Sequence, residues 1–130
     1  MKFLTPYAEP LYAVLRIVGG LLFAQHGVQK LFGILGGQRV DDPLMIAAGV
    51  IELAGGLLIA LGLLTVPAAF IASGEMAVAY FKTHFPQGFW PIENGGELAA
   101  LYCFLFLYVA ARGPGVWSLD RTFRRGSPRS

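Results

Sequence analysis

Long apolar runs separated by short turns rich in proline, glycine or polar residues dominate the chain. A helix needs about 20 mostly apolar residues, within a range of about 17–25, to cross a hydrocarbon core about 30 Å thick. Four segments fit or nearly fit this length, at about 11–35, 44–64, 65–82 and 95–112. The pattern therefore predicts an all-α membrane protein, an antiparallel bundle of four transmembrane helices that forms a single domain over residues 1–130.

A signal peptide is the alternative interpretation of the first apolar segment. A signal sequence has a run of about 7–15 apolar residues followed by a cleavage site of small residues. The segment at 11–35 instead carries Arg16, Gln25 and Lys30. We therefore expect this helix to remain in the mature protein.

Composition supports the membrane interpretation. The chain is 55% hydrophobic and 14% charged, whereas charged residues make up about 25% of an average soluble protein. The single cysteine, Cys103, has no partner for an intrachain disulfide, and no Cys/His cluster has the spacing of a zinc or iron–sulfur site. The sequence predicts no metal site, no catalytic residue and no cofactor bound by this chain alone.

Charge is distributed unevenly along the chain. Residues 1–111 carry five basic and seven acidic side chains, whereas residues 112–130 carry five arginines and one acidic residue, Asp120. A basic segment beside an apolar helix is what the positive-inside rule expects at a cytoplasmic end. We therefore do not expect the chain to bind nucleic acid. We expect a basic cytoplasmic tail over 113–130 and, because the number of spans is even, both termini in the cytoplasm.

Ionisable side chains inside the expected spans are the candidates for function. A charge near the bilayer centre costs about 2.5–3.5 kcal/mol on insertion scales, so these groups should face inward and find partners. Depths calculated at about 1.5 Å per residue pair Arg16 with Glu75 in one half of the bilayer. In the other half they place His26 and Lys30 with Glu52 and Glu97.

A polar intramembrane cluster is therefore predicted as the binding site. Its members are Arg16, Gln25, His26, Gln29, Lys30, Glu52, Glu75 and Glu97. One interpretation is structural, because one buried ion pair is enough to fix the register of a helix bundle. The other is a pocket that binds a small molecule or relays a proton, and the number of polar groups near Lys30 favours it. Haem ligation by His26 and His84 is a further alternative that nothing else in the sequence supports.

Two further features concern packing and anchoring. Glycines in the first two helices provide small surfaces that let helix backbones approach closely; they are Gly19, Gly20, Gly49, Gly55 and Gly56. Aromatic residues crowd the segment between the third and fourth helices, at Phe81, Phe85, Phe89 and Trp90. Interfacial anchoring explains these rings best, although a flat ligand such as a quinone would also stack on them.

Five short motifs, taken in order, resemble the DoxX family of small integral membrane proteins. They are Leu15-Arg16-Ile17, the segment His26-Gly27-Val28-Gln29-Lys30, Glu52 before Gly55-Gly56, Asn94-Gly95-Gly96-Glu97, and the closing segment from Gly113 to Asp120. The resemblance covers nearly the whole chain. It implies a four-helix bundle in the bacterial inner membrane.

The resemblance also implies an association with redox systems. The family takes its name from a subunit of a terminal quinol oxidase, and relatives are linked to the oxidation of sulfur compounds and to oxidative-stress complexes. One hypothesis is therefore a non-catalytic subunit or anchor of an oxidoreductase assembly that contacts partner subunits and a quinone. The other is a small-solute binding or transport protein that uses His26, Lys30, Glu52 and Glu97 and acts as a homo-oligomer.

Overall fold

The computed structural model describes residues 1–125, and all the secondary-structure elements in that part are helices. The prediction of an all-α fold is confirmed. Two helical segments are long and apolar enough to cross a membrane, Thr5–Phe32 and Pro43–Leu61. The last part of the predicted tail, residues 126–130 with Arg129, lies outside the described residues.

Each of the four segments expected to be helical contains a helix. The elements in chain order are η1 (Thr5–Tyr7), α1 (Ala8–Phe32), α2 (Pro43–Leu61), α3 (Thr65–Ala79), η2 (Tyr80–His84), η3 (Phe85–Gln87), α4 (Pro91–Asn94), α5 (Glu97–Arg112) and α6 (Leu119–Arg125). The helix expected over 65–82 is α-helical as far as Ala79 and then continues as a π-helical turn, η2. The expected tail contains α6.

Local sequence explains where α1 ends and where α2 begins. Gly33 ends α1 in the left-handed region at φ 67°, which a residue without Cβ adopts at little cost. Asp42 caps α2 by accepting a hydrogen bond from the Met45 N–H, and Pro43 occupies the first turn, where its missing N–H is not needed.

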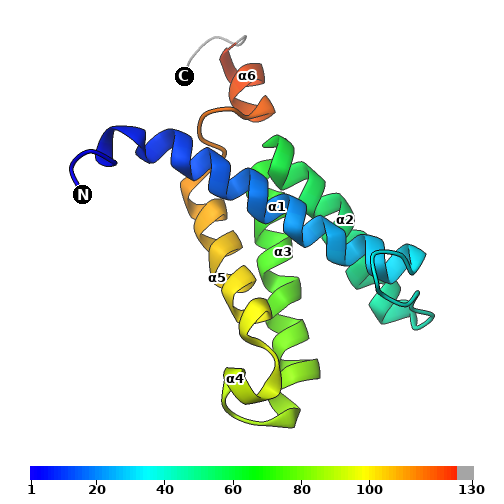
Figure 1. Cartoon of the computed structure of the whole chain (residues 1–130). Coiled ribbons are helices and arrows are strands. Elements are labelled where there is room, and N and C mark those ends of the chain that lie inside the picture. The colour runs from blue at the N-terminus through cyan, green and yellow to red at the C-terminus, as the bar shows by residue number, and fades with distance from the viewer. Residues whose placement is uncertain (126–130) are drawn as a thin grey trace.

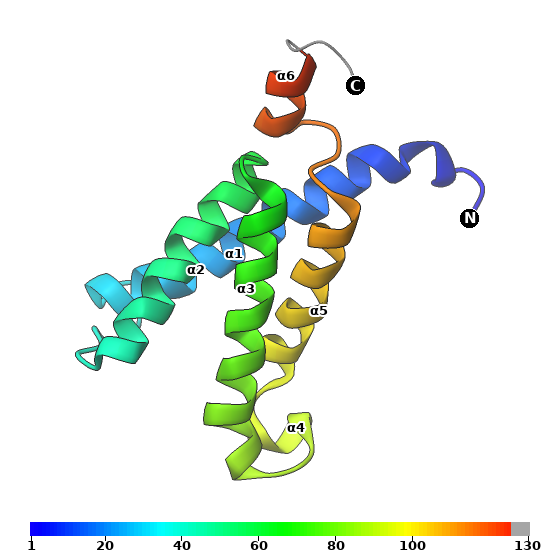
Figure 2. The ribbon, with the colours of Figure 1, turned by 180° about the vertical axis from the view of Figure 1, so that it is seen from behind.

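The long helices form two hairpins that diverge. α1 packs along α2, α3 packs along α5, and α2 and α3 are joined by a short turn at one end. From that end the α1–α2 hairpin and the α3–α5 hairpin separate, so their far ends lie apart in both views (Figures 1 and 2). The contact between α1 and α5 is small by comparison.

Glycines allow α1 and α2 to lie close together, as the sequence predicts for Gly20, Gly49 and Gly56. The prediction is wrong for Gly19, which faces Leu105 of α5, and for Gly55, where a Cβ atom would meet nothing within 4 Å. A Cβ atom on Gly20 would lie 2.6 Å from the Gly56 carbonyl oxygen, and one on Gly27 would lie 2.6 Å from the Gly49 carbonyl oxygen. Real Cβ atoms do not approach backbone this closely. The contact between these helices therefore depends on the missing side chains.

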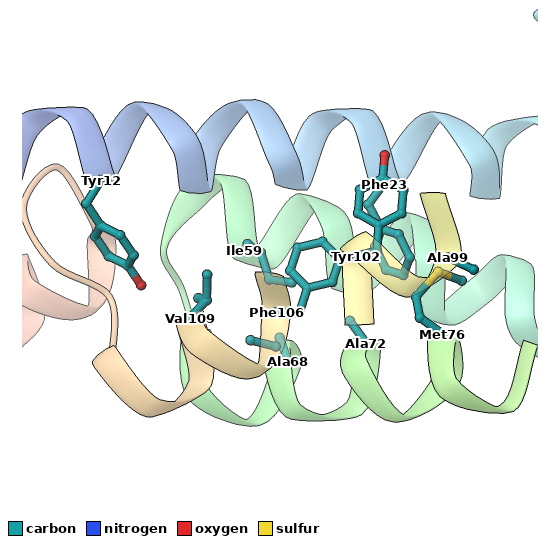
Figure 3. Close-up of a cluster of buried hydrophobic side chains, with 11 residues drawn as sticks. Tyr12, Phe23, Ile59, Ala68, Ala72, Met76, Ala99, Tyr102, Phe106 and Val109 are labelled. Atoms are coloured by element: carbon teal, nitrogen blue, oxygen red, sulfur yellow. The ribbon is translucent and has the colours of Figure 1, made fainter. Parts of the chain in front are cut away.

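The core lies where α1 crosses the second hairpin. Phe23 reaches from α1 to the α5 rings, with its centroid 4.8 Å from that of Phe106 and 5.3 Å from that of Tyr102 (Figure 3). Ala69 and Ala72 on α3 are fully buried. Because α3 presents alanines there, the aromatic rings of the other helices fit against it.

The segment after α5 returns to the α2–α3 turn. The Asp120 carboxylate accepts hydrogen bonds from the backbone N–H groups of Leu64 (2.9 Å) and Thr65 (2.8 Å), and the Asp120 N–H donates to the Gly62 carbonyl. Partial burial raises the pKa of Asp120, but the hydrogen bonds from Thr65 and Leu64 outweigh this effect and leave the pKa below its usual value. Asp120 thus caps α3 from a distant part of the chain.

Candidate functional site

Arg16 is held by backbone carbonyl groups. Its residue is 1% exposed, and its guanidinium donates to the carboxyl-terminal end of α2 and to the segment that follows α5. The acceptors are the carbonyl oxygens of Ile59, Ala60, Pro114, Val116 and Trp117. This guanidinium therefore joins three parts of the chain without a carboxylate.

The predicted pair of Arg16 with Glu75 is wrong. Arg16 lies beside the end of α2, close to where α3 begins at Thr65. Glu75 comes ten residues later, which places it about 15 Å further along α3, beyond the reach of this arginine. The donors of Arg16 are used by the carbonyl groups instead.

A cleft of about 630 Å³ lies between the two hairpins. Most of its lining is apolar and comes from α1, α2, α3 and α5. The polar and aromatic side chains in the lining are Phe23, His26, Lys30, Glu52, Glu75, Lys82, Thr83, His84 and Tyr102. Four of the eight predicted site residues, His26, Lys30, Glu52 and Glu75, therefore meet in this cleft.

An ion pair between α1 and α2 lies in the cleft wall. The Lys30 ammonium donates to Glu52 Oε1 at 2.6 Å. The Glu52 side chain is 1% exposed and that of Lys30 is 23% exposed. The predicted pairing of Lys30 with Glu52 is confirmed, and this bond ties the first hairpin together at the site.

Glu75 adds a second carboxyl group to this pair. Glu75 comes from α3 and lines the same cleft as Glu52 and Lys30. Within the described residues, Glu52 Oε2 and Glu75 Oε1 are buried and receive no hydrogen bond. Buried polar atoms without partners are rare in proteins, which marks this end of the cleft as a candidate binding point.

Aromatic side chains form the wall next to the ions. The His26 ring meets Tyr102 edge to face, with centroids 6.1 Å apart, and the Phe23 ring is tilted against the same tyrosine, with centroids 5.3 Å apart. The cleft lining therefore combines aromatic, apolar and charged side chains.

Lys82 and His84 also line the cleft, and sequence reasoning did not include them in the cluster. Lys82 lies seven residues, or two helical turns, after Glu75, and this spacing was the signal that could have found it. No comparable signal exists for His84, because its position depends on the π-helical turn η2 and on the hydrogen bond between His84 Nδ1 and the Asn94 carbonyl at 3.2 Å.

The other predicted members of the cluster lie outside the cleft lining. Gln25 is exposed, and Glu97 is exposed at the start of α5. The Gln29 amide donates to the Leu35 carbonyl at 2.8 Å, which holds the turn after α1. The expected grouping of Glu97 with Lys30, His26 and Glu52 is therefore wrong, because α5 diverges from α1.

Comparison with known proteins adds a family relationship. The sequence model of the DoxX family matches residues 11–85. The chain is similar to an uncharacterized protein of Haemophilus influenzae, at 47% identity over 95% of this chain and 98% of that protein. It is also similar to an uncharacterized membrane protein of Mycobacterium tuberculosis, at 32% identity over 86% of this chain and 80% of that protein. No solved structure matches the chain significantly.

Proposed function

The chain belongs to the DoxX family of membrane proteins, and from this premise we propose that it is a non-catalytic subunit of an oxidoreductase assembly. In this proposal it binds a lipid-soluble ligand of the quinone class in the cleft between its hairpins. The partner subunits supply the redox centres.

Four spans in the bacterial inner membrane are part of the proposal. The helical segment 65–84, which consists of α3 and η2, is long enough to cross the hydrocarbon core. α5 carries no charged residue between Leu98 and Ala111. Both helices expose large apolar side chains, among them Phe70, Ile71, Val78, Leu101, Phe104 and Leu107. Lipid is the partner that suits these surfaces. The basic tail supports a cytoplasmic location for both termini.

The cleft carries the proposal for a ligand. Its volume of about 630 Å³ lies within the range of about 300–1,000 Å³ that is typical of small-molecule sites. Its lining is mostly apolar, with the rings of Phe23 and Tyr102 on one side and the Lys30 ammonium among the carboxyl groups. A flat ring with carbonyl groups would lie against this apolar lining and accept a hydrogen bond from the Lys30 ammonium.

A small-solute binding or transport protein is the alternative function. The observation that favours it is the presence of Lys30, Lys82 and His84 in one cleft lining, because basic groups attract an anionic solute. Four spans from one chain would need a second copy to form a pathway across the membrane, so this function requires a homo-oligomer.

Ligand binding is tested with the full chain in lipid nanodiscs and decylubiquinone as the probe. Gly74 lines the cleft, and a Cβ atom there would meet nothing within 4 Å. We expect Gly74→Leu to fill the cleft and abolish binding without disturbing the fold, and Lys30→Met to weaken binding about tenfold, the effect of losing a hydrogen bond to a charged group. Lys2→Met, at an exposed lysine, is the control. Unchanged binding in both cleft variants contradicts the proposed site.

The assembly is tested separately by purification in mild detergent. We expect a subunit with a bound redox cofactor to co-purify with the chain and to be detected by its absorbance. A chain that purifies alone under these conditions and binds no quinone in nanodiscs would contradict the proposed role, whereas saturable binding of small anions would favour the alternative.

A further inference from the structure

Two carboxyl groups and the Lys30 ammonium lie in the same cleft lining. Lys30 donates to one oxygen of Glu52, and among the described residues the other Glu52 oxygen and one Glu75 oxygen are buried without a hydrogen bond. Glu52 comes from α2 and Glu75 from α3, the next helix in the chain. One positive charge thus serves two acids at this point.

Two ionised carboxylates at one apolar site repel each other, and burying an unpaired charge costs far more than protonating it. Lys30 stabilises the charge on Glu52 through a bond of 2.6 Å. The proton therefore belongs on Glu75, from where it can be donated to the free oxygen of Glu52 and satisfy both unpartnered atoms.

We propose that Glu52 and Glu75 hold one exchangeable proton between them and that the cleft uses this proton to bind ligands with a carbonyl head group. The inference rests on the proposed function for the identity of the ligand, but the proton site itself follows from the charges and contacts of these residues. Without a ligand this proton is donated to Glu52; when a ligand binds, the protonated Glu75 donates it to the ligand's carbonyl oxygen instead, whereas an ionised Glu75 repels that oxygen.

Other titratable groups line the cleft from the neighbouring elements. His26 and Lys30 come from α1, Lys82 and His84 from η2, and Tyr102 from α5. Among the described residues, Glu52 forms an ion pair with Lys30 alone, and Lys82 is exposed two helical turns beyond Glu75, about 10 Å further along the helix. Lys30 is therefore the cation that shares the site with both acids.

The proton site is tested without any ligand by infrared spectroscopy of the full chain in nanodiscs. We expect the carbonyl stretch of a protonated carboxylic acid, shifted in heavy water and lost when the pH is raised. Glu75→Gln should remove this band, and Glu97→Gln, at an exposed glutamate outside the cleft, should leave it. Glu52→Gln is a second variant that should also remove the band, because Glu75 then pairs with Lys30 and ionises. A band that survives both cleft variants, or no band at any pH, overturns the inference.

The link to the ligand is tested by measuring decylubiquinone affinity against pH. Above the pKa of the shared proton, the affinity of the unmodified chain should fall by about tenfold for each pH unit. Glu75→Gln should bind with an affinity independent of pH over the same range, because its amide keeps a donor. Binding that does not depend on pH contradicts the inference and leaves the proposed function intact, whereas the infrared band without any quinone binding contradicts the proposed function and leaves the proton site intact.

Discussion

The Arg16 guanidinium lies between the end of α2 and the segment that follows α5, and five carbonyl oxygens accept its hydrogen bonds. Carbonyl groups at the end of a helix have no partner within that helix and carry partial negative charge. These carbonyl groups therefore give a buried cation much of the electrostatic stabilisation that a carboxylate would provide. The same contacts fix the closing segment against the first hairpin, which is a structural role outside the cleft.

Replacing Arg16 by Met should destabilise the protein strongly. The substitution leaves several buried carbonyl groups without a donor, and hydrogen bonds to charged groups contribute about 1.5–3 kcal/mol each, so we expect a loss of about 3 kcal/mol in the free energy of unfolding. Denaturation of the chain in mixed micelles measures this loss.

Arg16→Lys should recover only part of this stability, because an ammonium group cannot reach carbonyl groups in the fork geometry of a guanidinium. Arg112 serves as the control, since it pairs with Glu9 at an exposed position. An Arg16→Met variant as stable as Arg112→Gln would contradict the structural role.

Residue chemistry limits what the sequence can predict about the candidate site. Lys30 and Glu52 were paired correctly because opposite charges at similar depth in an apolar chain have few other partners. The same reasoning failed for Arg16 because backbone carbonyl groups have no signature in a sequence. It also separated Glu75 from Glu52, because depths counted at about 1.5 Å per residue along each helix assign Glu75 to the half of the bilayer that contains Arg16.

At the scale of the helices, the contact between α1 and α2 depends on Gly20. Gly20→Ala places a Cβ atom 2.6 Å from backbone atoms of α2, and forcing extra atoms into a packed contact costs about 1–3 kcal/mol. We therefore expect a loss of this size in the free energy of unfolding, measured by denaturation in mixed micelles.

Gly55→Ala is the matched control on the facing helix. A Cβ atom there meets nothing within 4 Å, and alanine in a helix is favoured over glycine by about 0.5–1 kcal/mol. This variant should be neutral or slightly more stable than the unmodified chain. Equal effects of the two substitutions would show that the close approach of the helices does not contribute to stability.

The elements followed from the sequence more closely than their ends did. Apolar periodicity and Pro43 locate α1 and α2 within a few residues, but Gly33 and Gly62 end both helices three residues before the expected bounds. The π-helical turn at 80–84 has no signature in the composition; in the structure, Asn94 of α4 forms hydrogen bonds with Tyr80 and His84 of this turn. The cap that Asp120 provides for α3 joins residues 55 and 56 positions apart, and local sequence contains no sign of it.

At the scale of the whole molecule, the divergence of the two hairpins creates the cleft. Apolar faces on all four long helices are compatible with both a parallel arrangement and a splayed one, so the sequence alone could not place Glu97 outside the site. In the splayed arrangement, the short α2–α3 turn and the closing segment around Arg16 hold the hairpins together at one end (Figure 1). The opposite ends of the hairpins lie apart.

The proposed four spans give the last prediction, which concerns the sides of the membrane. If the second hairpin crosses the bilayer as the first does, the turn at 33–42 and the segment at 80–96 lie together on the side opposite the termini. In a Cys103→Ser background, Gln38→Cys and Gln87→Cys should both react with a membrane-impermeant maleimide in spheroplasts, whereas Thr122→Cys should react only after permeabilisation. All three positions are exposed.

Labelling of Gln87→Cys only after permeabilisation would mean that α3 and α5 do not cross, since two spans also return the tail to the cytoplasm. Gln87 is therefore the position that distinguishes four spans from two.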